Sequence, residues 1–193
     1  MVGEHGRSST QTDSRLVWGH VKIESPAFTE EDVQAFMDVY ADRERHLLAD
    51  RLQAASDRIA ALGPRITRQV SDDTEWTAHE LLAHIAVLSK YYGVLVHRVA
   101  SGKLPELNLL EAANLRDAAG REMSQRDPAE IVQMTLADHA RTVNELRTAE
   151  AASLRRSARV DDGTSMTAEE IARLPLISHL ETHIDELEKM LDR

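Results

Sequence analysis

The feature that most constrains the fold of this chain is a series of four helical patterns that begins at Thr29. In each pattern the apolar residues recur at steps of three and four, which places them on one face of an α-helix. Capping signals mark the ends, among them the capping boxes Thr77-x-x-Glu80 and Thr167-x-x-Glu170. The expected helices cover residues 29–62, 77–101, 127–154 and 167 nearly to the C-terminus. Because no segment has a convincing strand pattern, the sequence predicts an all-α fold.

Three segments depart from regular helix. Residues 1–27 are polar and have no helical period, so we expect a partly disordered arm before a helical domain of residues 28–193. Residues 103–126, between the second and third helices, are too many for a simple turn, and long connections are often functional. Pro175 lies inside the fourth pattern and is expected to kink the helix or to separate its first two turns.

Composition argues against several classes of protein. The net charge of −10 disfavours nucleic-acid binding, which normally needs a basic patch. Without cysteine the chain has no disulfide, thiolate metal site or cysteine nucleophile. No run of about 18 apolar residues predicts a membrane span, and the polar N-terminus does not resemble a secretory signal. We therefore expect a cytoplasmic protein with no membrane or nucleic-acid partner. Nine histidines, roughly twice the usual share, are the unusual feature.

The strongest chemical signal is a pair of histidines, His179 and His183, in the fourth helix. Residues four apart stack on one side of a helix, so both imidazoles can reach one ion. A projection at about 100° per residue puts this pair on or beside the apolar face, and puts His84 inward on the second helix. The same projection directs His79 and His97 away from the interior. Three histidines leave coordination positions open for water or substrate, as a catalytic metal site requires.

Spacing alone leaves two interpretations of these histidines open. Pairs four residues apart occur by chance, and a histidine at the edge of an apolar face is usually hydrogen-bonded rather than bound to metal. Two rival metal sites fail on geometry. His79 and His84 are five residues apart and diverge by about 140°, so they do not form a zinc-protease pair. The paired Glu-x-x-His motifs of di-iron helical proteins are missing from the sequence.

Three short motifs occur together in one order and separation. Residues 76–85 open with Trp76-Thr77 and continue to Glu80 and His84, the fourth helix has its His-x-x-x-His pair, and residues 104–105 (Leu-Pro) precede Asn114. Together these motifs resemble the DinB/YfiT-like family, which includes mycothiol-dependent maleylpyruvate isomerases, over about residues 29–192. The resemblance implies a four-helix bundle of up-down-down-up order with a long connection between helices two and three.

The resemblance also implies a site and a chemistry. The implied site holds a divalent metal, zinc or nickel, through His84, His179 and His183. The chemistry is that of a thiol S-transferase or hydrolase acting on a small molecule, and a low-molecular-weight thiol is a candidate cofactor because the chain has no thiol of its own. We expect a homodimer, because the apolar surface of such bundles often pairs with a second copy. The alternative is a non-catalytic bundle that serves as a stress-related interaction or structural protein.

Other residues are candidates for supporting roles. His139 lies near the centre of the apolar stripe of the third helix, so we expect a hydrogen-bonded core histidine, with support of the metal site as the alternative. Glu80 lies one turn before His84 and is a candidate for orienting its imidazole, although the capping box already accounts for it. Arg116 and Arg121 are candidates for binding the carboxylates of a thiol cofactor, with solvated surface charge as the alternative.

Overall fold

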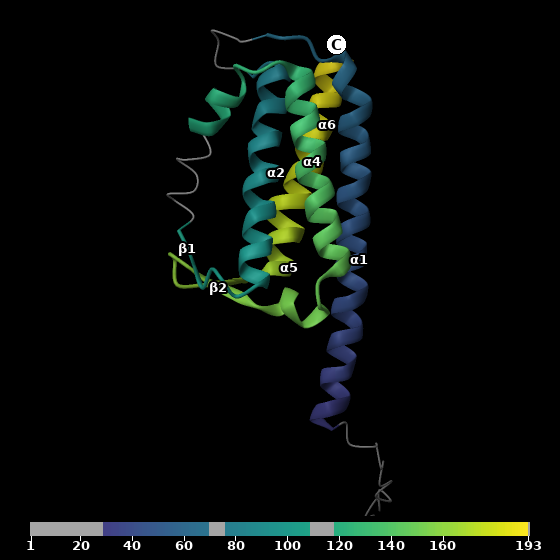
Figure 1. Ribbon diagram of the computed structural model, residues 1–193, viewed down its shortest axis with the longest axis vertical. Coiled ribbons are helices and arrows are strands. Elements are labelled where there is room, and N and C mark those ends of the chain that lie inside the picture. Colours follow the sequence, from purple (N-terminus) through teal and green to yellow (C-terminus); the bar gives the residue numbers. More distant parts are fainter. Residues whose placement is uncertain (1–28, 70–75, 109–117, 193) are drawn as a thin grey trace, which may run out of the picture.

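The computed structural model describes residues 29–69, 76–108 and 118–192, and most of these residues are helical. The predicted polar arm, residues 1–27, lies outside the described residues. The predominantly helical character expected from the sequence is confirmed. Four long helices lie side by side (Figure 1): α1 (Glu30–Leu62), α2 (Ala78–Ala100), α4 (Pro128–Thr148) and α6 (His179–Leu191). A short helix α5 (Ala168–Ile171) leads into α6 through a π-helical segment, Ala172–Ser178.

The predicted capping residues begin the helices. Thr29, Thr77 and Thr167 each accept a hydrogen bond from the backbone N–H three residues further on, and the acidic side chain there bonds back to the threonine N–H. Asp127 caps α4, whose first residue is Pro128. The predicted end of this helix, near residue 154, is wrong: α4 ends at Thr148, and Ala151–Arg155 form a 3-10 turn. Leu154 is buried in that turn, and so it extended the apolar pattern beyond the helix.

Cross-helix hydrogen bonds record the relative directions of the long helices. Three arginines along α1 and just after it, seven residues apart, bind acidic residues successively further along α6, so these two helices are parallel. The pairs are Arg51 with Glu181, Arg58 with Asp185 and Glu188, and Arg65 with Asp192. Bonds of α2 to α4, from Ser89 to His139 and from His97 to Glu145, likewise advance along both helices. Figure 1 shows that α2 and α4 run opposite to α1 and α6.

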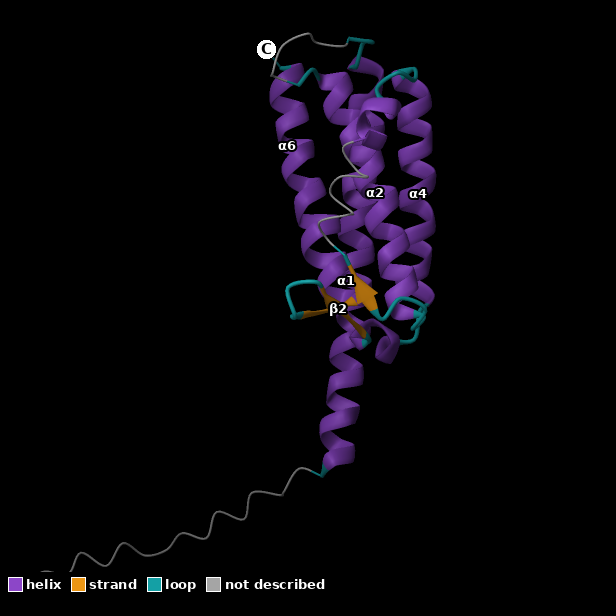
Figure 2. Ribbon diagram, turned by 90° about the vertical axis from the view of Figure 1, so that its left-hand side faces the viewer, coloured by secondary structure: helices purple, strands orange, loops and turns teal. Residues whose placement is uncertain are grey.

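A small three-stranded sheet lies at the end of the helices from which α1 projects (Figure 2). Its strands are β1 (Glu106–Leu107), β2 (Ser157–Val160) and β3 (Ser165–Thr167), with β1 parallel and β3 antiparallel to the central β2. The sequence prediction of no strands is therefore wrong. Segments of two to four residues are too short to show an alternating pattern of polar and apolar residues.

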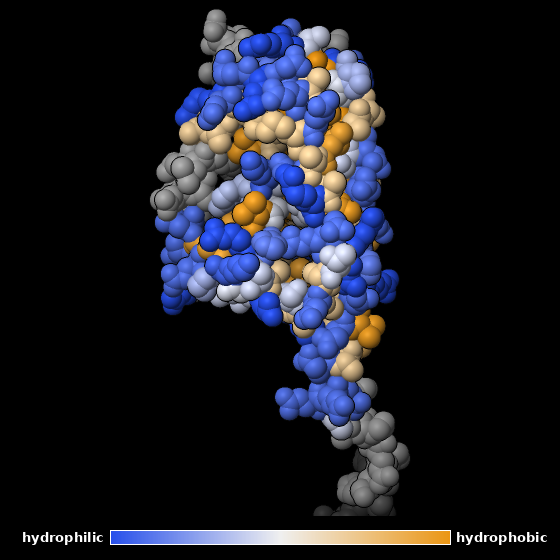
Figure 3. All heavy atoms as spheres, viewed as in Figure 1, coloured by the Kyte–Doolittle hydropathy of each residue, from blue (hydrophilic) through white to orange (hydrophobic). Residues whose placement is uncertain are grey.

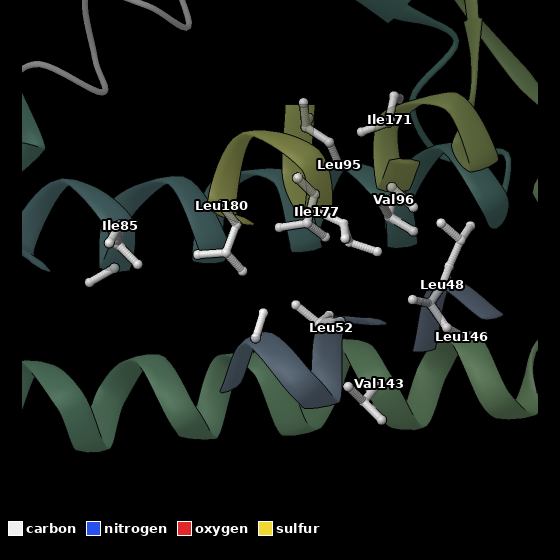
Figure 4. Packing of buried hydrophobic residues seen from close by; sticks show 14 of the residues in the cluster. Leu48, Leu52, Ile85, Leu95, Val96, Val143, Leu146, Ile171, Ile177 and Leu180 are labelled. Atoms are coloured by element: carbon white, nitrogen blue, oxygen red, sulfur yellow. The ribbon is translucent and has the colours of Figure 1, made fainter. Parts of the chain in front are cut away.

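The core fills the space between the four long helices (Figure 4). Both α4 and α6 contact α1 and α2, so each long helix buries a face against two others. This burial fixes which side of α2 and α6 faces inward, and thereby positions the histidines. Core side chains come from every long helix: Leu48 and Leu52 of α1, Ile85, Leu95 and Val96 of α2, Val143 and Leu146 of α4, and Leu180 of α6.

Pro175 lies within the π-helical segment. Proline has no N–H to donate to an α-helical bond and its ring crowds the preceding turn, so a wider turn with bonds to the fifth residue relieves both effects. The prediction that Pro175 perturbs the fourth helix is confirmed, but the chain there stays helical through to α6 instead of breaking.

The N-terminal part of α1 projects beyond the other helices (Figures 1 and 2). It exposes large apolar side chains, among them Val33, Phe36, Val39 and Tyr40, with Phe36 68% and Val39 71% exposed. Figure 3 shows apolar atoms on this projecting part. Among the described helices, none combines the length and apolar character needed to cross a membrane.

Candidate metal centre

Three histidines from two neighbouring helices face one another at the centre of the candidate site. His84 comes from α2, and His179 and His183 come from successive turns of α6. Each offers one ring nitrogen, and these three atoms lie within 4.8 Å of one another. The Nε2 atoms of His179 and His183 are 2.8 Å apart. All three side chains are half-buried, so the group is held by the fold and is still reachable from solvent. The structure thus brings together the three residues that the sequence predicts as ligands.

An arginine of α1 holds the turn of α6 that carries the histidine pair. Nε of Arg51 donates to Glu181 at 3.0 Å, and its Nη2 donates to the same carboxylate at 2.5 Å and to Ser178 Oγ at 3.2 Å. Glu181 lies between the two histidines in sequence, so its side chain points to α1 while theirs point to α2. This two-atom contact fixes the rotation of α6 about its own axis.

Two residues that the sequence analysis did not place at the site contact its histidines. Glu186 lies one turn after His183, and its Oε2 is 2.7 Å from His183 Nδ1. The carboxylate accepts a hydrogen bond from the Nδ1–H group of His183, which favours the tautomer whose Nε2 carries the lone pair that a metal needs, as in many metal sites. Trp76 places its ring 4.5 Å from the ring of His84. The spacing of three residues from a predicted ligand could have indicated Glu186, whereas no spacing rule indicates the contact of Trp76.

The donor set fits a divalent transition metal. In a tetrahedral zinc site with Zn–N distances of about 2.0–2.1 Å, the ligating nitrogens lie about 3.4 Å apart. The nitrogens here lie within 4.8 Å of one another, so small rotations of the imidazoles would bring them to that geometry. Neutral imidazoles suit zinc and nickel alike.

Two pockets of different chemistry flank the cluster. The first, called the polar pocket for the charged and polar side chains in its lining, has a volume of about 310 Å³ and is lined by Trp76, Glu80, His84, Gly120, Arg121 and Ser124. The second, of about 380 Å³, is lined by Tyr92, Leu95, Leu107, Met166, Ile171, Leu174, Pro175 and His179. The cluster therefore meets the polar pocket through His84 and the apolar pocket through His179. Arg121, a candidate for binding carboxylates, lines the polar pocket, whereas Arg116 and Asn114 lie outside the described residues.

The two candidates for support of the metal site have other partners in the structure. His139 is 1% exposed, and its Nε2 is 2.8 Å from Ser89 Oγ. Its Nδ1 has no hydrogen-bond partner among the described residues, and burial lowers the pKa of His139 to about 4. Glu80 accepts the bond from the Thr77 N–H at 2.8 Å and lines the polar pocket beside His84. A role of either residue at a metal stays a prediction.

The remaining histidines of α2 differ from each other. His97 lies at the surface, where its Nδ1 is 2.5 Å from Glu145 Oε1, as the projection predicts. The same prediction is wrong for His79, which is fully buried, with Nδ1 3.1 Å from Gln69 O and Nε2 3.0 Å from Arg126 O. The segments that follow α1 and precede α4 cover this side of α2, and a projection of one helix cannot show such coverage.

Comparisons of the chain with protein-family models, curated proteins and solved structures find no match. The grounds for a function are therefore the geometry of the histidine cluster, the two pockets beside it and the motifs of the sequence.

Proposed function

We propose that this protein is a metal-dependent enzyme of the DinB/YfiT type, with zinc or nickel bound by His84, His179 and His183. The observation that carries the proposal is the convergence of three imidazole nitrogens, from two helices, within 4.8 Å of one another. The proposed fold is the up-down-down-up four-helix bundle of that family. Its support is that α2 and α4 run opposite to α1 and α6, with a long connection between residues 100 and 128.

The proposed reaction is either the transfer of a thiol to a small molecule or the hydrolysis of a small molecule. A divalent ion with three neutral ligands lowers the pKa of a thiol or water at an open position and so supplies a nucleophile near neutral pH. The chain's own residues prepare the position: Glu186 sets the tautomer of His183, and Trp76 packs on the ring of His84. Arg121 in the polar pocket offers a positive charge for the carboxylates of a low-molecular-weight thiol, which must come from outside because the chain has no cysteine.

Metal analysis of the purified protein tests the proposal. We expect one zinc or nickel per chain in the parent and in His97→Ala, a matched control that removes a surface histidine of α2. We expect its loss from His183→Ala, in which only two imidazoles remain. Chelator-treated protein should take the metal back when zinc or nickel is added. A parent that holds no stoichiometric metal, before or after this addition, contradicts the proposal.

The alternative function, a non-catalytic interaction or structural protein, is favoured by the exposed apolar side chains on the projecting part of α1. Contiguous exposed apolar surface commonly marks a protein–protein contact. We propose a second copy of the chain as the partner, because an isolated projecting helix buries too little apolar surface to be stable by itself.

Light scattering tests the homodimer. We expect a dimeric mass for the parent and for Ala54→Asp, an exposed control site on the part of α1 that lies beside the other helices. Phe36→Asp should reduce the mass to that of a monomer. A monomeric parent contradicts the homodimer but leaves the metal site untouched, so the two proposals fail separately.

A further inference from the structure

The apolar pocket beside the cluster is built by segments that are far apart in sequence. It is lined by α2, by strands β1 and β3, and by the α5 and π-helical region that precedes α6, and it is open to solvent. The wall residues are Tyr92, Leu95, Leu107, Met166, Ile171, Leu174 and Pro175. With the exception of the Tyr92 hydroxyl, these side chains offer a bound molecule no hydrogen-bonding group. The pocket therefore suits an alkyl or aryl group and rejects a charged one.

His179 joins this pocket to the three-histidine cluster. Its side chain lines the pocket, and its Nε2 lies 2.8 Å from Nε2 of His183. A molecule whose apolar part fills the pocket thus has its other end at the cluster. The pocket volume of about 380 Å³ also exceeds the cavity of about 150 Å³ that accommodates benzene in an engineered protein.

The π-helical segment shapes the wall next to His179. Leu174 and Pro175 belong to it and line the pocket one turn before the histidine. Short π-helical turns are frequent at functional sites because the extra residue in the turn re-aims side chains. Here that turn places apolar side chains and a candidate ligand on the same side of the helix.

We propose that this pocket binds the apolar part of the substrate, an alkyl chain or aromatic ring, and presents the polar group attached to it to the three histidines. The inference rests on the proposed function for what happens at the histidines, whereas binding of the apolar group depends on the pocket alone. The polar pocket with Arg121, on the His84 side, then receives the second, charged reactant. The two reactants reach the cluster through different pockets.

Alkyl hydroxamates test both parts, because the hydroxamate group binds divalent metals and the chain length can be varied. Binding of acetohydroxamate and octanohydroxamate is measured by calorimetry on the zinc-loaded and on the chelator-treated protein. Each buried methylene contributes about fourfold in affinity, so octanohydroxamate should bind at least about 100-fold more tightly than acetohydroxamate in both forms of the protein. Zinc should strengthen the binding of both compounds.

Substitutions in the pocket wall locate the binding. Leu174 is 57% exposed and Val94 is 48% exposed, so an aspartate is tolerated at either position, but only Leu174 lines the apolar pocket. We expect Leu174→Asp to reduce the ratio of octanohydroxamate affinity to acetohydroxamate affinity by at least about tenfold. Zinc binding and acetohydroxamate affinity should be retained. Val94→Asp should behave as the parent. Met166→Glu changes the part of the pocket wall that β3 supplies, and it should reduce the same affinity ratio.

The outcomes separate the two proposals. Equal affinity for the short and long hydroxamates, or a chain-length effect that Leu174→Asp and Met166→Glu both leave intact, overturns the pocket inference. A chain-length effect that these variants remove, in a protein that takes up no zinc, supports the pocket and overturns the metal-dependent function.

Discussion

Two groups of histidines in this fold differ in burial and in partners. His84, His179 and His183 are half-buried, and their ring nitrogens converge. By contrast, His79 and His139 are almost completely inaccessible. Both ring nitrogens of His79 lie against backbone carbonyls, and Nε2 of His139 lies against a serine hydroxyl. Complete burial therefore marks a structural histidine in this protein. A candidate metal ligand is marked by convergence with other imidazoles at a place that solvent reaches.

The largest expected effect concerns the buried histidine His139 and pH. Its pKa falls from about 6.5 in the unfolded chain to about 4 in the folded one, so between these values the unfolded chain binds a proton that the folded chain does not. Stability is therefore lost as pH falls from 6.5 to about 4, by about 3 kcal/mol from this group.

Urea unfolding of the chelator-treated protein across this pH range measures the loss. Between pH 6.5 and 4 the parent should lose about 3 kcal/mol more of its free energy of unfolding than His139→Leu, whereas His46→Leu, at an exposed site on α1, should follow the parent. A constant difference between parent and His139→Leu would show that His139 is protonated as easily in the folded chain as in the unfolded one.

The next effect concerns the converging histidines and zinc. Zinc at 100 times its dissociation constant should raise the free energy of unfolding of the parent by about 2.7 kcal/mol, since it binds the folded chain only. His139→Asn should show the same increase, because His139 bonds to Ser89. His84→Ala should show almost none. An equal increase in His84→Ala, measured by urea unfolding with and without zinc, would remove His84 from the ligand set.

A smaller effect is expected for Glu186, which positions His183 through its Nδ1. Glu186→Gln should weaken zinc binding by about 10- to 100-fold, as is usual for a group that orients a ligand imidazole. The thermal stability of the zinc-free protein should stay unchanged. Glu188→Gln is the matched control on the same helix, because Glu188 binds Arg58 instead. Zinc affinity is measured by competition with a chelating dye. Similar affinities for the two variants would show that Glu186 has no role in zinc binding.

The smallest effect is expected for His97, whose side chain is about half exposed and pairs with Glu145. Exposed polar contacts of this kind contribute little, so His97→Ala should change the free energy of unfolding by less than about 1 kcal/mol and leave zinc affinity unaltered. A loss of zinc affinity in this variant would mean that histidines outside the converging group also bind the metal.

The sequence was sufficient for the parts of the fold that depend on local chemistry. A threonine followed three residues later by a glutamate marked the true starts of the helices at Thr77 and Thr167, because a capping box satisfies N–H groups within one turn. The start at Thr29 was indicated by the capping threonine and the acidic residues after it. The inward side of α6 followed from its apolar period. That His84 and the α6 pair lie together was a consequence of tertiary packing, and the sequence indicated it only through the family resemblance.

The parts that the sequence missed depend on contacts between distant segments. The strands are too short to carry a period, yet they supply Leu107 and Met166 to the apolar pocket. Burial of His79 depends on backbone carbonyls of Gln69 and Arg126, which no projection of α2 contains. The sequence therefore indicated the candidate ligands better than the cavity that surrounds them.

The π-helical turn before His179 has a consequence for how sequence changes affect this protein. Such a turn contains one residue more than an α-helical turn. Because each residue of a π-helix turns the chain by less than the 100° of an α-helix, the seven residues Ala172–Ser178 sweep roughly the angle of six α-helical residues. Deletion of one residue within this segment would therefore allow a regular helix and leave both imidazoles of α6 in nearly their present direction. The wall formed by Leu174 and Pro175 would change instead, so such a deletion should alter the apolar pocket and spare the histidine cluster.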